Sequence, residues 1–168
     1  MARIDRSKRA MGTAVKRDKP SQAAQVLVRL GLTRGRVLDY GCGFGFDADH
    51  FGWESFDPFY RPKEPSELYD TVVCTLVLSA LSRNNRAEVL ERIRDLLAAD
   101  GIAYLGMARN IPVTGKMGVN HSLQNYVVLT LPSVYADENL EIYEYRKDSQ
   151  FKDKTKDYAS RRDRRRDR

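Results

Sequence analysis

Cysteine, histidine and long apolar runs are all scarce in this chain of 168 residues. Its two cysteines, Cys42 and Cys74, each lie in an apolar stretch, so we expect no disulfide framework and predict a reduced, cytoplasmic protein. The longest uncharged apolar run, residues 71–82, is too short to span a bilayer. Charge begins at Arg3 with no apolar segment behind it, so we expect neither export nor a membrane partner.

The net charge of +6 is spread unevenly along the chain. Residues 1–20 carry +5 and residues 148–168 carry +4, whereas residues 21–147 between them carry −3. The basic character therefore belongs to two arms, because the body is slightly acidic. We predict a basic N-terminal arm over 1–20, one folded domain over 21–147, and a basic, disordered tail over 148–168, where too few apolar residues remain to form a core.

Strands alternate with helices in the body of the chain, which is typical of an α/β domain. We predict one helix over 21–30 with Ser21 as its N-cap, and a second that begins at Asn85, three residues before Glu88 in capping-box spacing. Residues 109–125 are predicted to be a loop. Strands are expected at 36–40, 53–57, 71–78, 102–107, 126–131 and 140–145, the last two as a terminal pair.

The run Val37-Leu-Asp-Tyr-Gly-Cys-Gly-Phe-Gly45 places an acidic residue at the end of a strand and three alternating glycines in the turn that follows. Glycine lets a ligand approach the backbone closely, where a Cβ atom would block it. A dinucleotide fingerprint requires G-x-G-x-x-G, but Phe46 and Ala48 stand at the two positions where the third glycine would fall. The turn therefore predicts a ligand site that is not a dinucleotide fingerprint, with a glycine-rich turn that binds nothing as the alternative.

This segment resembles the first motif of the class I, Rossmann-like S-adenosylmethionine-dependent methyltransferases, in which a strand ending in Asp or Glu precedes G-x-G-x-G. The resemblance covers roughly residues 21–147, which would be a methyltransferase-like domain. Residues 57–62 and 76–78 are also similar to segments of the small methyltransferases associated with DNA phosphorothioation clusters. The resemblance implies a mostly parallel sheet that ends in an antiparallel hairpin.

The spacing departs from the family in one respect. The interval between Asp57 and Asp70 leaves no room for the family's third strand, nor for the acid on that strand that contacts adenine. We therefore predict a minimal sheet that lacks the third strand. Phe59 and Tyr60 could supply an apolar or stacking wall for the adenine, with ordinary packing under a proline-rich loop as the alternative.

The resemblance implies S-adenosylmethionine as the cofactor. Its predicted site consists of Asp39, Gly41, Cys42, Gly43, Gly45, Asp57, Pro58, Phe59, Thr75, Leu76 and Arg17. Asp57 would hold the ribose hydroxyls, with Glu54 as the competing acid, because a carboxylate at the carboxyl end of a strand can accept two hydroxyl hydrogen bonds. Arg17 would pair with the carboxylate of the cofactor.

The methyl acceptor is not identified by the sequence. No [DNS]-P-P-[YFW] motif follows the strand over 71–78, and neither cysteine follows a proline as a cytosine C5 nucleophile would. The candidate residues for the acceptor site lie in the loop over 109–125 and are Arg109, Lys116, His121, Gln124 and Asn125. We predict His121 as the catalytic base, with a merely solvated histidine as the alternative, and no metal site.

The sequence is compatible with two functions. One is methyl transfer to an unidentified acceptor, with nucleic acid as a candidate because residues 161–168 could grip phosphates. The other is a noncatalytic S-adenosylmethionine-binding or nucleic-acid-binding module that has the methyltransferase fold. Turnover with any acceptor would distinguish the two.

Overall fold

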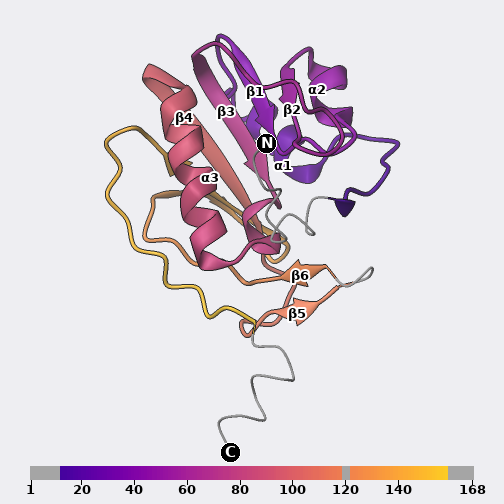
Figure 1. Ribbon diagram of the computed structural model, residues 1–168, viewed down its shortest axis with the longest axis vertical. Coiled ribbons are helices and arrows are strands. Elements are labelled where there is room, and N and C mark those ends of the chain that lie inside the picture. Colours follow the sequence, from indigo (N-terminus) through magenta and orange to yellow (C-terminus); the bar gives the residue numbers. More distant parts are fainter. Residues whose placement is uncertain (1–11, 119–121, 159–168) are drawn as a thin grey trace, which may run out of the picture.

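A computed structural model describes residues 12–118 and 122–158, which form a central sheet flanked by helices (Figure 1). The strands of the main sheet lie in the order β2-β1-β3-β4-β8-β7. The helices are α1 (Gln22–Arg29), α2 (Phe46–Phe51), the 3-10 helix η2 (Leu78–Ala80) and α3 (Arg83–Leu96). The strands are β1 (Val37–Tyr40), β2 (Glu54–Phe56), β3 (Tyr69–Thr75), β4 (Leu97–Ala108), β5 (Lys116–Met117), β6 (Leu123–Gln124), β7 (Ser133–Ala136) and β8 (Leu140–Tyr145). No helix in these residues is both long and apolar enough to cross a membrane.

The sheet combines parallel and antiparallel pairing. Strands β2, β1, β3 and β4 are parallel to one another, whereas β8 runs antiparallel to both β4 and β7. Strand β2 is the edge of this sheet, and the described chain between β2 and β3 contributes no strand beyond it. The prediction of a mostly parallel sheet with an antiparallel terminal hairpin and no third strand is therefore confirmed.

The four parallel strands bring their carboxyl ends to one edge of the sheet. Tyr40 at the end of β1 is in register with Phe56 at the end of β2, and Thr75 at the end of β3 is in register with Gly106 of β4. In open α/β sheets the ligand binds in the crevice outside this edge. A ligand site is therefore expected among the residues that follow these strands.

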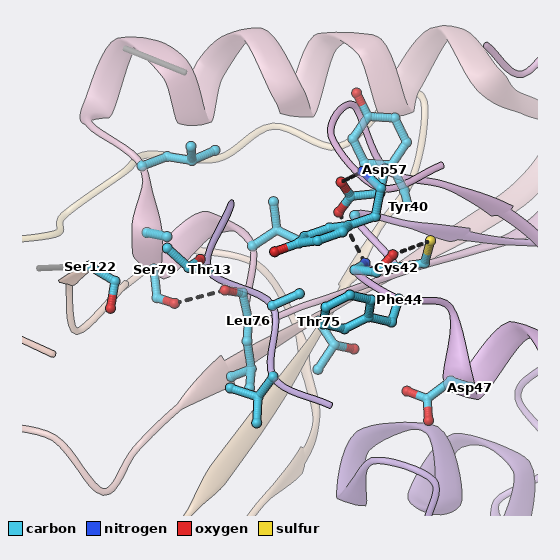
Figure 2. Close-up of a pocket in the computed structure, with 18 of the residues that line it drawn as sticks. Thr13, Tyr40, Cys42, Phe44, Asp47, Asp57, Thr75, Leu76, Ser79 and Ser122 are labelled. Atoms are coloured by element: carbon cyan, nitrogen blue, oxygen red, sulfur yellow. Dashed lines mark hydrogen bonds between the residues drawn. The ribbon is translucent and has the colours of Figure 1, made fainter. Parts of the chain in front are cut away.

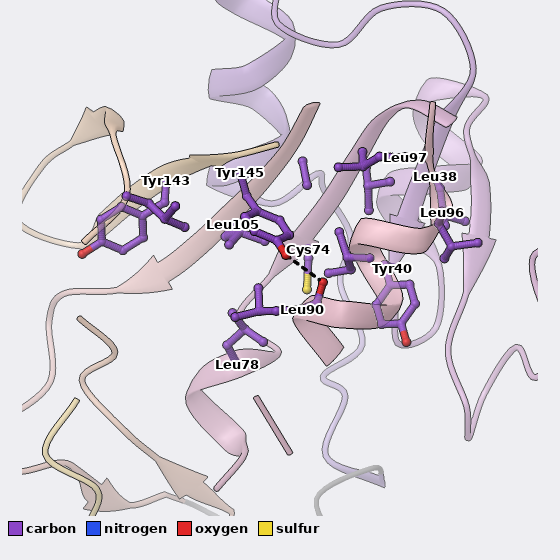
Figure 3. Close-up of a cluster of buried hydrophobic side chains, with 14 of the residues drawn as sticks. Leu38, Tyr40, Cys74, Leu78, Leu90, Leu96, Leu97, Leu105, Tyr143 and Tyr145 are labelled. Carbon is purple, nitrogen blue, oxygen red and sulfur yellow. Dashed lines mark hydrogen bonds between the residues drawn. The ribbon is translucent and has the colours of Figure 1, made fainter. Parts of the chain in front are cut away.

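Helix α3 covers one face of the sheet (Figure 1). Its buried side chains Leu90, Ile93 and Leu96 recur at helical spacing and join the larger apolar cluster. Figure 3 shows Tyr145 of β8 reaching this cluster, where its hydroxyl donates to the Leu90 carbonyl at 3.2 Å. Helix α1 packs on the other face of the sheet, where Leu27 joins the second cluster.

Several local predictions were wrong. The strand expected over 71–78 ends at Thr75, and the loop expected over 109–125 contains strands β5 and β6. Helix α3 begins three residues earlier than expected, because Ser82 is its N-cap and accepts from the Asn85 backbone N–H at 3.5 Å. Residues 126–131 are not a strand of the main sheet, and β7 takes their place beside β8. Val127 and Leu129 do bury alternate side chains as a strand would, but the Val128 carbonyl accepts from the Lys154 N–H instead of from β8.

The C-terminal segment, defined here as residues 148–158, differs from the expected disordered tail. Asp153 and Asp157 form ion pairs of 2.8 and 2.6 Å with Arg86 of α3, whose side chain is 0% exposed. The Thr155 hydroxyl accepts from the Val128 N–H at 3.0 Å. This segment is polar, yet it is fixed because its acids neutralise a buried guanidinium. The division of the chain into arm, domain and tail remains a prediction.

Candidate functional site

The glycine turn adopts the conformation that its sequence allows. Gly41, Gly43 and Gly45 have φ angles of 79°, 56° and 83°, in the left-handed region that disfavours side chains. A Cβ atom at Gly43 would lie 2.8 Å from the Cβ of Ala14. Glycine at this position therefore allows the N-terminal segment to cross close over the turn.

Asp57 connects the turn to the loop that follows β2. Its Oδ2 accepts from the Gly43 N–H at 3.0 Å, and its Oδ1 accepts from the Phe59 and Tyr60 N–H groups at 2.9 Å each (Figure 2). Glu54 lies at the opposite end of β2, where it pairs with Arg36 at 2.7 Å. Of the two candidate acids, Asp57 is therefore the one beside the glycine turn.

Arg61 holds the turn from outside, and sequence reasoning assigned it no role. Its guanidinium donates to the Phe44 carbonyl at 2.7 Å and to both carboxylate oxygens of Asp49 at 2.8 and 2.6 Å. The guanidinium also lies against Gly45, and a Cβ atom at Gly45 would collide with it. Asp57 and Arg61 exchange two backbone hydrogen bonds, which close a tight turn directly after β2. This turn lies in the segment between β2 and β3, which contains no strand.

Asp39 is buried behind the glycine turn. Burial raises its pKa to about 7, with repulsion from Asp47 as the second cause, while the charges of Arg17 and Arg61 act in the opposite direction. Burial also raises the pKa of the Cys42 thiol to about 12, with the negative charge of Asp39 adding to the effect. Cys42 therefore remains a thiol at neutral pH and is a poor nucleophile.

A cavity of about 1050 Å³ lies at this edge of the sheet (Figure 2). It is lined by nine of the predicted cofactor residues, namely Gly41, Cys42, Gly43, Gly45, Asp57, Pro58, Thr75, Leu76 and Arg17. The other two do not line it: Asp39 lies behind the turn, and Phe59 is 62% exposed elsewhere on the loop. Tyr60 does line it. His121, the predicted base, lies outside the described residues.

Leu76 follows β3 directly and has an unusual backbone. Its φ of 61° makes it the non-glycine residue with positive φ among the described residues, and its side chain is 41% exposed where it lines the cavity. Its N–H donates to the Gly106 carbonyl at 2.8 Å, and its carbonyl accepts from the Ser79 hydroxyl at 3.1 Å. Such strained residues cluster at functional sites. The resemblance already assigned Leu76 to the cofactor site, but no local pattern in the sequence marks its positive φ.

The N-terminal segment, residues 13–17, forms another wall of the cavity. Lys16 places its Nζ 5.9 Å from the centre of the Phe44 ring. Arg17 forms an ion pair of 3.4 Å with Asp47, which in turn accepts from the Ser21 N–H at 2.7 Å. Only Arg17 of this segment was assigned to the site from sequence, because its neighbours carry no motif.

Comparison with solved structures shows which fold this is. The 1,6-didemethyltoxoflavin-N1-methyltransferase of Burkholderia thailandensis, solved with S-adenosylhomocysteine, matches with TM-score 0.51 and 16% identity over 73% of this chain and 76% of that one. DhpI, solved with S-adenosylhomocysteine, matches with TM-score 0.53 and 13% identity over 73% and 81% of the two chains. The chain has the class I methyltransferase fold.

The other comparisons do not extend the result beyond the fold. PKMT2 of Rickettsia typhi, solved with AdoHcy, matches with TM-score 0.33 and 20% identity over 44% of this chain, which spans only 21% of that protein. No protein-family model and no curated protein matches the sequence. Within the described residues, no group of three or more His, Cys, Asp or Glu side chains is arranged to hold a metal ion.

Proposed function

We propose that the chain binds S-adenosylmethionine in the cavity and transfers its methyl group to a second molecule bound there. The observation that carries the proposal is the contact between Asp57 and the glycine turn at the carboxyl edge of a methyltransferase-type sheet. Two proteins with the same fold were solved with S-adenosylhomocysteine, the product that remains after methyl transfer.

Charge in the cavity suits this cofactor. Glu64 lines the cavity, and Asp47, Asp49 and Asp57 line the part of it beside the glycine turn, since α2 begins directly after Gly45 and Asp57 accepts from the Gly43 N–H. S-Adenosylmethionine carries a positive sulfonium and a positive ammonium group, so carboxylates nearby would stabilise it. Arg17 lines the same part and is proposed to share its guanidinium between Asp47 and the cofactor's carboxylate.

Asp57 is proposed to accept from the ribose. A carboxylate has about four acceptor sites, and the three backbone N–H groups already use three of them. The remaining capacity suits one ribose hydroxyl, so the second hydroxyl would need another acceptor or water. Tyr60 and Pro58, which line the cavity beside Asp57, are proposed to take the place of the absent adenine-contacting strand.

The chemistry needs little from the protein beyond placement. When bound, the cofactor would supply an activated methyl group, with the methyl–sulfur bond breaking as the methyl–acceptor bond forms and S-adenosylhomocysteine left as the product. The chain positions the acceptor in line with that bond and excludes water from it. Any proton on the acceptor passes to a base or to water, and the assignment of His121 as that base remains a prediction. Binding that persists without turnover on any acceptor would favour a noncatalytic module instead.

The proposal is tested by calorimetric titration with S-adenosylhomocysteine. We expect saturable binding at one site, and Asp57→Ala should weaken it by roughly 1.5–3 kcal/mol, the range for a hydrogen bond to a charged group. Glu54→Ala is the matched control, because it removes an acid from the same strand at the end away from the cavity. Equal losses for the two variants, with both folded by circular dichroism, would contradict the assignment.

A further inference from the structure

The cavity lining continues well beyond the glycine turn. Its volume of about 1050 Å³ is at the upper end of the range of about 300–1,000 Å³ for small-molecule pockets. It extends from the glycine turn to the β5–β6 hairpin, and Figure 2 shows Asp47 and Ser122 at opposite ends of the view. The far half is defined here by Ser79, Leu81, Asn110, Ile111, Lys116 and Gln124. These residues leave room for a second molecule beside the first.

The two halves differ in charge. The acids that line the cavity are Asp47, Asp49, Asp57 and Glu64, and none of them is among the residues that define the far half. The guanidinium groups of the first half face acids, since Arg17 pairs with Asp47 at 3.4 Å and Arg92 with Glu64 at 3.3 Å. Lys116 is the cation of the far half, and no ion pair joins it to an acid in the described part of the chain.

The hairpin that carries Lys116 is firmly attached to the rest of the site. Lys116 lies opposite Gln124 in the β5–β6 register, so the two side chains leave the same face of the hairpin. Asn125, which is fully buried, donates its backbone N–H to the Ser79 carbonyl at 2.7 Å and its amide to the Leu81 carbonyl at 3.2 Å. Its Oδ1 accepts from the Tyr158 N–H at 2.7 Å.

Apolar surface lies between this hairpin and the glycine turn. Leu76, Leu81 and Ile111 line the cavity there, and they would cover the body of a flat or ring-shaped molecule. The ammonium of Lys116 and the amides of Asn110 and Gln124 then offer donors to one end of it. Binding at that end would fix the orientation of the opposite end, which must meet the methyl group.

We infer that the far half of the cavity binds a small acceptor with an apolar body and an anionic group, such as a carboxylate, that pairs with Lys116. This inference rests on the proposed function, because the far half is an acceptor site only if the other half holds the methyl donor. A small molecule is favoured over a nucleic acid strand because the cavity is also walled by residues 13–17, which cross over the glycine turn.

The test compares benzoate with benzamide, which have nearly the same shape and differ in charge. Each is titrated into the full chain at pH 7 by ligand-observed NMR, with and without saturating S-adenosylhomocysteine. We expect benzoate to bind about tenfold more tightly than benzamide, as one charge-assisted contact gives. Lys116→Met should abolish this preference and Lys116→Arg should retain it. Lys152→Met, which removes an exposed lysine that does not line the cavity, should change nothing.

The outcomes separate this inference from the proposed function. If S-adenosylhomocysteine binds but benzoate shows no preference over benzamide, or retains it in Lys116→Met, the acceptor site is overturned while the cofactor site stands. If neither probe binds and a short single-stranded oligonucleotide binds in a Lys116-dependent way, the small anionic acceptor is also overturned. Failure of S-adenosylhomocysteine itself to bind overturns the proposed function, and the titrations without it still measure whether Lys116 selects an anion.

Discussion

The turn region (residues 41–61) and the C-terminal segment (residues 148–158) are both irregular, yet they are held by different forces. The turn region is fixed by glycine backbone geometry and by hydrogen bonds between near neighbours, such as that from Gly43 to Asp57. The C-terminal segment is fixed by a buried cation, Arg86, whose partner Asp153 is 67 residues away. Changes in the turn region should therefore affect ligand binding, and changes around Arg86 should affect stability.

The largest expected effect is that of Arg86→Ala. This change leaves Asp153 and Asp157 without their cation, and it removes the shorter of the two hydrogen bonds to the Leu81 carbonyl, at 2.7 Å, while the one from Asn125 at 3.2 Å remains. Breaking a buried pair by removing one partner costs about 3–5 kcal/mol. We expect that loss in the free energy of unfolding measured by urea denaturation, with S-adenosylhomocysteine affinity unchanged below the transition.

Arg83→Ala is the control for this change. Arg83 is exposed, and it donates to the carbonyls of Asp153 and Thr155 at 2.7 and 2.9 Å, so its removal should cost about 1 kcal/mol. If Arg86→Ala cost no more than Arg83→Ala, the buried ion network would not be what holds the segment.

Gly43→Val should have the next largest effect, and the effect should fall on binding. A branched side chain at φ 56° is strained, and its Cβ would meet Ala14 and the space where the cofactor approaches the turn. Gly52→Val is the matched control, because Gly52 has φ 73° but open space around its Cβ position. Both variants should lose about 1–2 kcal/mol of stability, but only Gly43→Val should lose S-adenosylhomocysteine binding by calorimetry. Unchanged affinity in folded Gly43→Val would refute the role of the turn.

The same contrast explains what the sequence could predict. The glycine turn, the acid at the end of β2 and the absence of a third strand follow from local order and spacing, because the residues involved are close in the chain. The strand mistakenly expected over 126–131 has a true alternating pattern, seen at Val127 and Leu129, but periodicity does not say which segment supplies the partner. Arg86, Asp153 and Arg61 look like ordinary surface charges until the fold brings their partners to them.

Asp39 makes the turn region sensitive to pH. Its pKa is raised to about 7 in the folded chain, chiefly by burial, from the ordinary value of 3.8. The folded protein therefore retains a proton that the unfolded chain has lost, so this group's contribution to stability is present below pH 4 and declines as the pH rises to about 7. A cationic cofactor favours the ionised carboxylate, so its affinity should instead rise severalfold between pH 6 and pH 8.

Asp39→Asn tests both trends. The variant should flatten the decline in stability between pH 4 and pH 7 in thermal denaturation, and it should remove the rise in S-adenosylmethionine affinity above pH 6. His50, which lies at the end of α2 and does not line the cavity, offers a control in His50→Gln. A wild-type affinity that is flat across this range would argue that the ionisation of Asp39 is not coupled to cofactor binding.

The smallest expected effect is that of shortening the C-terminal end of the chain. The C-terminal segment contains three lysines and three aspartates and carries no net charge, so the whole +4 of residues 148–168 belongs to residues 159–168. Deleting 159–168 therefore removes the basic charge while the ion pairs of Arg86 remain, whereas deleting 148–168 removes both.

If the basic end binds phosphates, the shorter deletion should lower the affinity for a single-stranded oligonucleotide and flatten the salt dependence of that affinity. Stability and S-adenosylhomocysteine affinity should stay the same, because the cavity and the ion network are intact. An unchanged salt slope would show that the basic end does not bind nucleic acid, and a small-molecule acceptor would then be the better explanation of the cavity.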